Sequence, residues 1–142
     1  MAPVSQDRHT LVLYRASERA DAALRDLCLA ARERGSRVTV LALAPQERPA
    51  SRCCDTRSVL WNGICRDLAR NDLRRAAQAL EGRAEVDFDV LLAPGHRLVA
   101  ALTGEALTRG ADQIVLADPP SSGLNRRERW LLRRRSPVPV SA

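Results

Sequence analysis

Arginine side chains give this 142-residue sequence its clearest means of binding a ligand. All 23 basic residues are arginines, and the formal net charge is +6. Guanidinium groups bind carboxylates and phosphates through paired hydrogen bonds, so the composition permits partners such as nucleic acid or small anions. Six of the arginines lie between Arg126 and Arg135, but Glu128 interrupts the run and aromatic residues do not alternate with it. This pattern favours a solvated helix face over a surface for stacked bases.

A narrower hypothesis places a small anion between two loops that follow expected strands. In a parallel α/β sheet, ligands bind beyond the carboxyl ends of the strands, where the strand order reverses. Arg15 follows the first expected strand, and a loop rich in serine and proline follows a later one. The residues predicted to form this ligand-binding site are Arg15, Ser17, Ser121, Ser122, Gly123, Arg126 and Arg127.

The four cysteines do not follow a metal-binding pattern. Cys53 and Cys54 are adjacent, whereas chelating pairs are usually separated by two residues, and no second pair is present. No metal site is therefore predicted. A redox role for Cys53 and Cys54 stays open if one thiolate is exposed and stabilised by Arg52 or Arg57. Cys28 falls on the apolar stripe of an expected helix and is predicted to lie in the core.

Neither histidine has a catalytic partner in the sequence. His9 precedes the first expected strand, and His96 lies in a turn before a helix. No nucleophile elbow and no pair of acids at catalytic spacing accompanies either of them. Both are interpreted as surface residues, and the chain is predicted not to be an enzyme and to hold no cofactor.

An alternating series of strands and helices must position these residues. Short apolar runs rich in β-branched residues predict strands, and apolar residues spaced three and four apart predict helices. The expected strands are Thr10–Tyr14, Val38–Ala44, Val86–Ala93, Ile114–Ala117 and Pro137–Val140. The expected helices run from Ser17 to Gly35, from Asn62 to Leu80, from Arg97 to Arg109 and through the arginine-rich segment, with a long connection over Pro45–Trp61. This alternation predicts a single α/β domain over residues 1–142, with a parallel sheet and helices on both faces.

Two local features carry predictions of their own. Asp72 projects from the middle of the apolar face of the second helix, so either that helical register is wrong or the carboxylate has a buried arginine partner. Pro137 and Pro139 lack N–H donors on one side of the last strand, and that side is predicted to be the outer edge of the sheet.

The beginning of the sequence carries no signal for export. MAPVSQDRH lacks the apolar core of a signal peptide, and no stretch approaches the roughly 18 apolar residues of a membrane span. The protein is therefore expected to be cytoplasmic and to make no contact with a membrane.

The chain resembles a known family over nearly its whole length, and its final segment is the most distinctive part of the resemblance. The segments GADQIVLA, SSGLNRR and SPVPV follow one another between residues 110 and 140. They are similar to segments of universal stress proteins, whose members commonly read GADLIVMG, then a glycine-rich loop with RSGLSR, then APCPVLVV. The resemblance implies an open five-stranded parallel sheet in the order 3-2-1-4-5, of the adenine nucleotide alpha hydrolase-like type, with a long variable connection after the second strand.

The ATP-binding motif of that family is not matched by this chain. Nucleotide-binding members carry a glycine, two residues, a second glycine, nine residues, and a third glycine followed by serine or threonine. Aligned on Ser122 and Gly123, these positions fall on Ala117, Pro120, Trp130 and Leu131. The acid that contacts adenosine in the family falls on Arg15, and the last helix is about one turn shorter. Because proline donates no N–H and tryptophan blocks close approach of the backbone, the resemblance implies that ATP binding through this motif is lost.

The predicted function follows from the resemblance and from these departures. The chain is expected to be a universal stress protein-like, non-ATP-binding, non-catalytic module in stress adaptation, and a homodimer through the C-terminal strand, Pro137–Ala142. The alternative is a binding protein for another anionic ligand or nucleic acid through Arg15 and the C-terminal arginines. A disfavoured third reading is a stress protein that binds and hydrolyses nucleotides.

Overall fold

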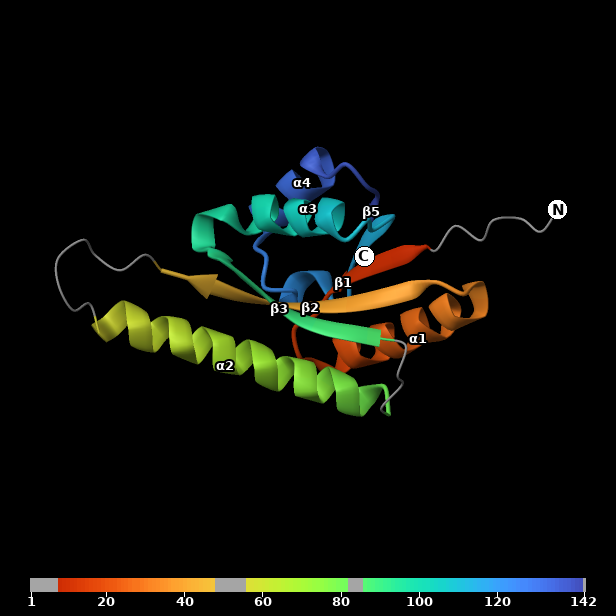
Figure 1. Cartoon of the computed structure of the whole chain (residues 1–142), viewed down its shortest axis with the longest axis horizontal. Helices are drawn as coiled ribbons and strands as arrows, with labels where there is room; N and C mark the ends of the chain where they lie inside the picture. The colour runs from red at the N-terminus through yellow and green to blue at the C-terminus, as the bar shows by residue number, and fades with distance from the viewer. Residues whose placement is uncertain (1–7, 48–55, 82–85, 142) are drawn as a thin grey trace.

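The fold is a three-layer arrangement of one parallel sheet between two layers of helices (Figure 1). The computed structural model describes residues 8–47, 56–81 and 86–141. The five strands lie in the order β3-β2-β1-β4-β5, and each pairs in parallel with its neighbour. The strands are β1 (His9–Leu13), β2 (Arg37–Gln46), β3 (Val86–Pro94), β4 (Gln113–Leu116) and β5 (Val140–Ser141). The predicted fold class and strand order are confirmed.

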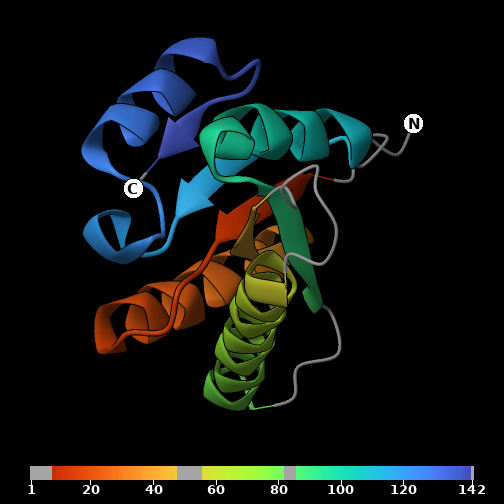
Figure 2. The same cartoon turned by 90° about the vertical axis from the view of Figure 1, so that its left-hand side faces the viewer.

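The helices divide between the two faces of the sheet (Figure 2). They are α1 (Glu18–Arg34), α2 (Thr56–Ala79), α3 (Leu98–Thr108) and α4 (Arg126–Arg135), with short 3-10 turns η1 (Gly95–Arg97) and η2 (Pro119–Ser121). In the central strand β1, Val12 packs with α1 and α2, while Leu11 and Leu13 pack with α3 and α4. No helix within the described ranges has the length and apolarity to cross a membrane.

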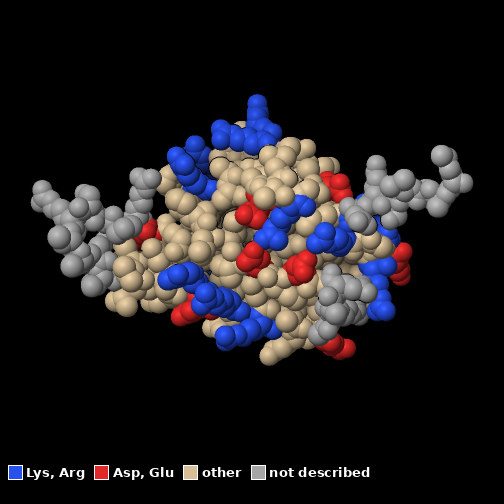
Figure 3. Space-filling model, viewed as in Figure 1, with Lys and Arg blue, Asp and Glu red and all other residues tan. Residues whose placement is uncertain are grey.

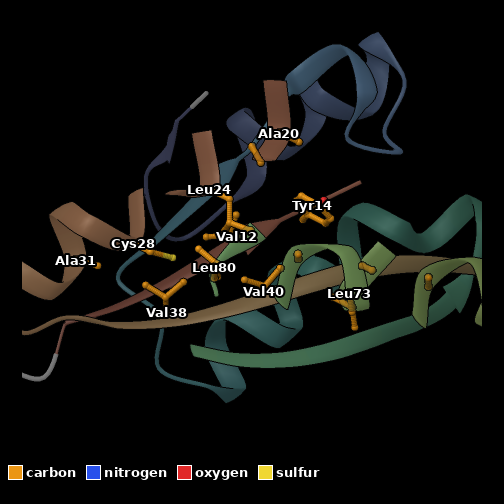
Figure 4. Packing of buried hydrophobic residues seen from close by; sticks show 14 of the residues in the cluster. Val12, Tyr14, Ala20, Leu24, Cys28, Ala31, Val38, Val40, Leu73 and Leu80 are labelled. Carbon is orange, nitrogen blue, oxygen red and sulfur yellow. The ribbon is translucent and has the colours of Figure 1, made fainter. Parts of the chain in front are cut away.

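Helix α1 forms where the sequence pattern places it. The hydroxyl of Ser17 accepts a hydrogen bond from the N–H of Ala20 at 3.0 Å, which caps the first turn. Gly35 ends the helix with φ 66°, a left-handed conformation that favours glycine. The stripe between these ends is buried, and Cys28 lies in the core beside Leu24, as predicted (Figure 4).

Helix α2 begins six residues earlier than predicted, at Thr56 instead of Asn62. The extra turns carry Val59, Leu60 and Trp61, which are exposed and so give no buried stripe that sequence periodicity could detect. The side chain of Asn62 accepts from the N–H of Glu47 at 2.8 Å and donates to the Glu47 carbonyl at 3.0 Å. These two bonds hold the second turn of α2 beside the end of β2.

The last strand, β5, is two residues long, and its orientation contradicts the prediction. The N–H of Ile114 in β4 donates to the carbonyl of Pro139 at 2.9 Å. In an extended strand, the N–H and C=O of one residue point to the same side, so Pro139 faces β4 and not the outer edge. Proline offers β4 no donor, which explains why regular pairing begins only at Val140. The Ser136 hydroxyl accepts from the N–H of Val138 at 3.2 Å and donates to its carbonyl at 2.7 Å.

His9 is buried, which corrects its interpretation as a surface residue. Its side chain lies at the start of β1 with 5% exposure. Its Nδ1 lies 3.0 Å from the carbonyl oxygen of Arg109, and its Nε2 lies 2.7 Å from the hydroxyl of Thr39. A carbonyl can only accept, so Nδ1 carries the proton and Nε2 accepts from the hydroxyl. His96, in η1, is exposed as predicted.

Candidate functional site

A pocket of about 230 Å³ lies beyond the carboxyl ends of β1 and β2. Tyr14 and Arg15 reach it from the end of β1, and Leu43 and Pro45 from the end of β2. The other lining residues come from α2 and from the loop after β4, namely Trp61, Cys65, Leu68, Ala69, Asp72, Ser122 and Gly123. The pocket therefore lies where ligands bind in open parallel sheets, next to the reversal of strand order between β1 and β4.

The structure brings together only part of the predicted anion site. Arg15, Ser122 and Gly123 line the pocket. Ser17 instead caps α1, and its hydroxyl donates to the carboxylate of Asp118 at 3.1 Å. The remaining predicted residues, Ser121, Arg126 and Arg127, belong to η2 and to the first turn of α4, outside the pocket lining described here.

Asp72 is the half-buried carboxylate of the pocket wall. Its neighbours Ala69, Leu73 and Ala76 are buried, so the predicted register of α2 is right. Burial raises the pKa of Asp72, while Arg15, the backbone N–H of Ala16 and Arg75 act in the opposite direction. Both Arg15 and Arg75 are exposed, so neither is the buried arginine partner expected from the sequence.

Replacing Asp72 with asparagine should raise the melting temperature at pH 7. The raised pKa means that the folded state disfavours the ionised carboxyl, so the charge costs stability at neutral pH. The gain should shrink as the pH falls through the raised pKa and vanish below the ordinary value of 3.8. Thermal unfolding of Asp72→Asn between pH 7 and pH 3 measures this, with the exposed Asp67→Asn as control. A lower melting temperature at pH 7 would show that the arginine contacts outweigh burial.

The floor of the pocket is fixed by a network that joins β1, α1 and α2. The Tyr14 hydroxyl donates to Asp21 of α1, and the Arg75 guanidinium of α2 donates to the same carboxylate at 3.0 Å. Burial, and then the neighbouring carboxylate, raise the pKa of Tyr14 well above its ordinary value of 10.0. The phenol is therefore neutral across the physiological range, and it acts as a structural donor.

Most backbone N–H donors of the loop after β4 already have acceptors close to them in the sequence. Pro119 and Pro120 have no N–H, and both lie in η2. Four of the remaining backbone donors are bonded locally: Ser121 to Asp118, Ser122 to Pro119, Leu124 to the Ser122 hydroxyl, and Asn125 to Glu128 in the first turn of α4. Arg129 also turns inward and donates to the carbonyls of Pro119 and Leu124, each at 3.0 Å. Gly123 has φ 94°, which favours glycine.

The arginines of α4 other than Arg129 are exposed and form a basic surface. Glu128, which interrupts the run, completes a capping box with Asn125 at the start of the helix. Arg134 lies over the ring of Trp130, 5.2 Å from its centroid. Figure 3 shows basic side chains gathered at the top of the molecule over α4, whereas acidic and basic side chains are mixed lower in the same view.

Within the described residues, the cysteine that lines the pocket does not have an activated thiol. Cys65 lines the pocket, and burial, followed by the charge of Glu47, raises the pKa of its thiol. Cys53 and Cys54, with their predicted redox role, lie outside the described residues. Across residues 8–47, 56–81 and 86–141, no group of three histidine, cysteine or acidic side chains is placed to hold a metal.

Trp61 and Leu68 are pocket residues that the sequence reasoning missed. Placing the start of the helix at Asn62 left Trp61 in a loop. Large apolar residues recur at positions 60, 61, 64 and 68, which is a helical spacing, but they do not belong to the buried stripe. This recurrence is the signal that indicates an exposed apolar surface.

Comparison of the structure with solved structures finds close matches to universal stress proteins over nearly the whole chain. A protein of that family from Burkholderia pseudomallei matches with a TM-score of 0.72 at 18% identity, over 99% of this chain and 98% of that chain. The universal stress protein UspA from Lactobacillus plantarum matches with a TM-score of 0.70 at 16% identity, over 94% and 95% of the two chains. The protein from Archaeoglobus fulgidus, in complex with dAMP, gives 0.61 at 21% identity, over 94% of each.

These similarities establish the fold. They confirm the resemblance to universal stress proteins at the level of the fold. No family model matches the sequence, and no curated protein matches it either.

Proposed function

We propose that this chain, which has the universal stress protein fold, is a non-catalytic ligand-binding module in stress adaptation that does not bind ATP through the loop after β4. The observation that carries the proposal is the shortage of available backbone N–H donors in that loop. Its prolines offer no N–H, and the donors of Ser121, Ser122, Leu124 and Asn125 are bonded within the loop or to the first turn of α4. A triphosphate needs several backbone donors directed at it, and opening this loop to supply them would break its internal bonds.

The position of the histidines supports a non-catalytic role. His9 lies at the amino end of β1, at the opposite end of the strand from the pocket, and its ring bonds Thr39 and the Arg109 carbonyl. His96 is exposed in η1 and is not part of the described pocket lining. The pocket carboxylate of Asp72 is contacted by the Ala16 N–H and faced by two arginines. This arrangement favours binding over proton transfer.

The proposed homodimer through the C-terminal strand would depend on side-chain packing. The backbone of Val138 is already bonded by the Ser136 hydroxyl, and β5 offers only Val140 and Ser141 as regular strand. A pairing of two such strands would gain few backbone hydrogen bonds, so apolar contacts around the end of the chain would supply most of the stability.

A thermal-shift titration tests the absence of ATP binding. Solved structures with this fold include complexes with dAMP and with cAMP, so the titration includes ATP, AMP, cyclic AMP and inorganic phosphate at constant ionic strength. A ligand at about one hundred times its dissociation constant adds roughly 2.7 kcal/mol to the folded state, which moves the melting temperature by several degrees. We expect millimolar ATP with magnesium to produce no such shift.

The other arms of the titration separate the competing readings. A saturable rise of the melting temperature with micromolar ATP would contradict the proposal. The protein would then be a nucleotide-binding protein with this fold. A shift with phosphate or AMP alone, abolished by Arg15→Gln, would instead support the second candidate, a binding protein for small anions. The exposed guanidinium of Arg15 at the pocket is the observation that favours this candidate. Nucleic-acid binding through α4 would appear as DNA affinity that falls steeply with salt.

A further inference from the structure

Helix α2 exposes a stripe of large apolar side chains along the mouth of the pocket. The stripe consists of Leu60, Trp61, Ile64 and Leu68, and each of these side chains is between 49% and 67% exposed. Their spacing of three, four and seven places them on one side of the helix. From Leu60 to Leu68 the stripe is about 12 Å long. Exposed apolar residues gathered in this way mark an interaction site more often than single ones do.

The stripe is continuous with the pocket. Trp61 and Leu68 belong to both, and the pocket wall behind them is formed by Leu43, Pro45 and Ala69. Binding pockets for small molecules usually measure about 300–1,000 Å³, so a pocket of about 230 Å³ would enclose one end of a ligand. The rest of such a ligand would lie along the stripe. An elongated apolar molecule fits this shape.

Two charged side chains, Arg15 and Asp72, belong to the pocket lining, and they define the head of the ligand. Arg15 is exposed and lines the pocket, and it makes no salt bridge within the described ranges. Asp72 lines the same pocket, and Arg15 acts on its carboxylate, but the Ala16 N–H and Arg75 share in balancing that charge. One guanidinium matches one carboxylate through two parallel hydrogen bonds. A phosphate dianion would need further donors, and the neighbouring loop has bonded most of its own.

We propose that the pocket binds an amphipathic carboxylic acid, with its carboxylate on Arg15 and its hydrocarbon chain along Trp61, Ile64 and Leu68. This inference rests on the proposed function, because it names the class of ligand for the same pocket. Charge complementarity at Arg15 and the concave shape of the site favour a fatty acid over a protein partner. A protein would cover the stripe but would leave the charged side chains of the pocket lining unmatched.

Tryptophan fluorescence provides a direct test, because the chain has two tryptophans and only Trp61 lines the pocket. In a Trp130→Phe background, the emission reports on Trp61 alone. Titration with decanoate, below the concentration at which it forms micelles, should change this emission saturably and raise the melting temperature. Decanol, which has the same chain without the charge, should bind more weakly. Acetate, which lacks the chain, should have no effect.

Variants separate the roles of head and chain. Arg15→Gln should weaken decanoate at least tenfold, the usual range for a lost charged hydrogen bond, and should leave decanol unchanged. Leu68→Gln should weaken both ligands. Matched exposed controls are Arg126→Gln on α4 and Leu107→Gln on α3, where Leu107 is 65% exposed, and neither should change the binding of either ligand. All four positions are exposed, so the variants should keep the fold, which their melting temperatures check.

The outcomes distinguish this inference from the proposed function. An unchanged Trp61 emission with decanoate, or equal effects of Leu107→Gln and Leu68→Gln, would overturn the fatty-acid site. Equal affinity for decanoate and decanol, insensitive to Arg15→Gln, would also overturn it, because the carboxylate would then have no role. If ATP raises the melting temperature while decanoate still binds as described, the claim about ATP fails and the fatty-acid site stands.

Discussion

Replacement of His9 with leucine should lower the free energy of unfolding by about 3 kcal/mol. Leucine retains apolar bulk but removes the ring bonds to the Arg109 carbonyl and the Thr39 hydroxyl, at 3.0 and 2.7 Å. The His9 ring and Thr39 are at least 95% buried, so water cannot replace the lost partners. Each buried polar group left unpaired costs about 1–3 kcal/mol. Urea unfolding followed by circular dichroism measures the change.

Two further variants show whether the His9 hydrogen bonds are responsible for the loss. His96→Leu, at an exposed histidine, should stay within about 0.5 kcal/mol of the parent. Adding Thr39→Val to His9→Leu should restore part of the stability, because removal of both partners leaves no orphaned hydroxyl. If His9→Leu is as stable as the parent, the hydrogen bonds of the His9 ring to Thr39 and Arg109 contribute nothing measurable to stability.

Replacement of Asp21 with alanine should cost about 2–3 kcal/mol, the second of the large effects. Asp21 accepts from the Tyr14 hydroxyl and from Arg75. Tyr14 is 1% exposed, so the substitution leaves its hydroxyl without this acceptor in the protein interior. Arg75 is exposed and can turn to water, so the loss of the ion pair adds little. The cost therefore arises mainly at the phenol, and urea unfolding measures it.

The control for this prediction is the exposed aspartate of the same helix, Asp26. Asp26→Ala removes the same charge from α1 and should change the stability by less than about 0.5 kcal/mol. Combining Tyr14→Phe with Asp21→Ala should recover much of the loss, because the orphaned hydroxyl is gone. If Asp21→Ala and Asp26→Ala behave alike, the Tyr14 network contributes nothing measurable to the fold.

The sequence was sufficient to predict the fold because local patterns and global topology agree over most of the chain. The stripe of α1 ends at Gly35, where the structure requires a positive φ, and the apolar run of β1 is buried on both faces. Alternation of strands and helices then leaves few topologies. The start of α2 could not be predicted, because its first turns expose their apolar residues and so lack the amphipathic pattern.

The site was only partly predictable, because some of its features depend on contacts between distant segments. Arg15 and Gly123 were found because they follow strands, and strand ends converge in a parallel sheet. Tyr14 and Arg75, which are 61 positions apart, are joined through the carboxylate of Asp21, and no sequence motif indicates this network. The burial of His9 depends on the register of β1 with β2, which the sequence does not specify.

The two open edges of the sheet determine how this protein meets other extended chains. At one edge, β3 presents the exposed side chains of Asp87 and Asp89, and charges along an edge strand oppose the addition of a further strand. At the other, the hydroxyl of Ser136 occupies the backbone groups of Val138, so little of the edge beside Val140 is left to extend. Both edges of the sheet are therefore poorly suited to pairing with strands of other molecules, and this opposes the growth of fibrils. Because α2 carries exposed apolar side chains, the protected edges favour reversible binding over aggregation.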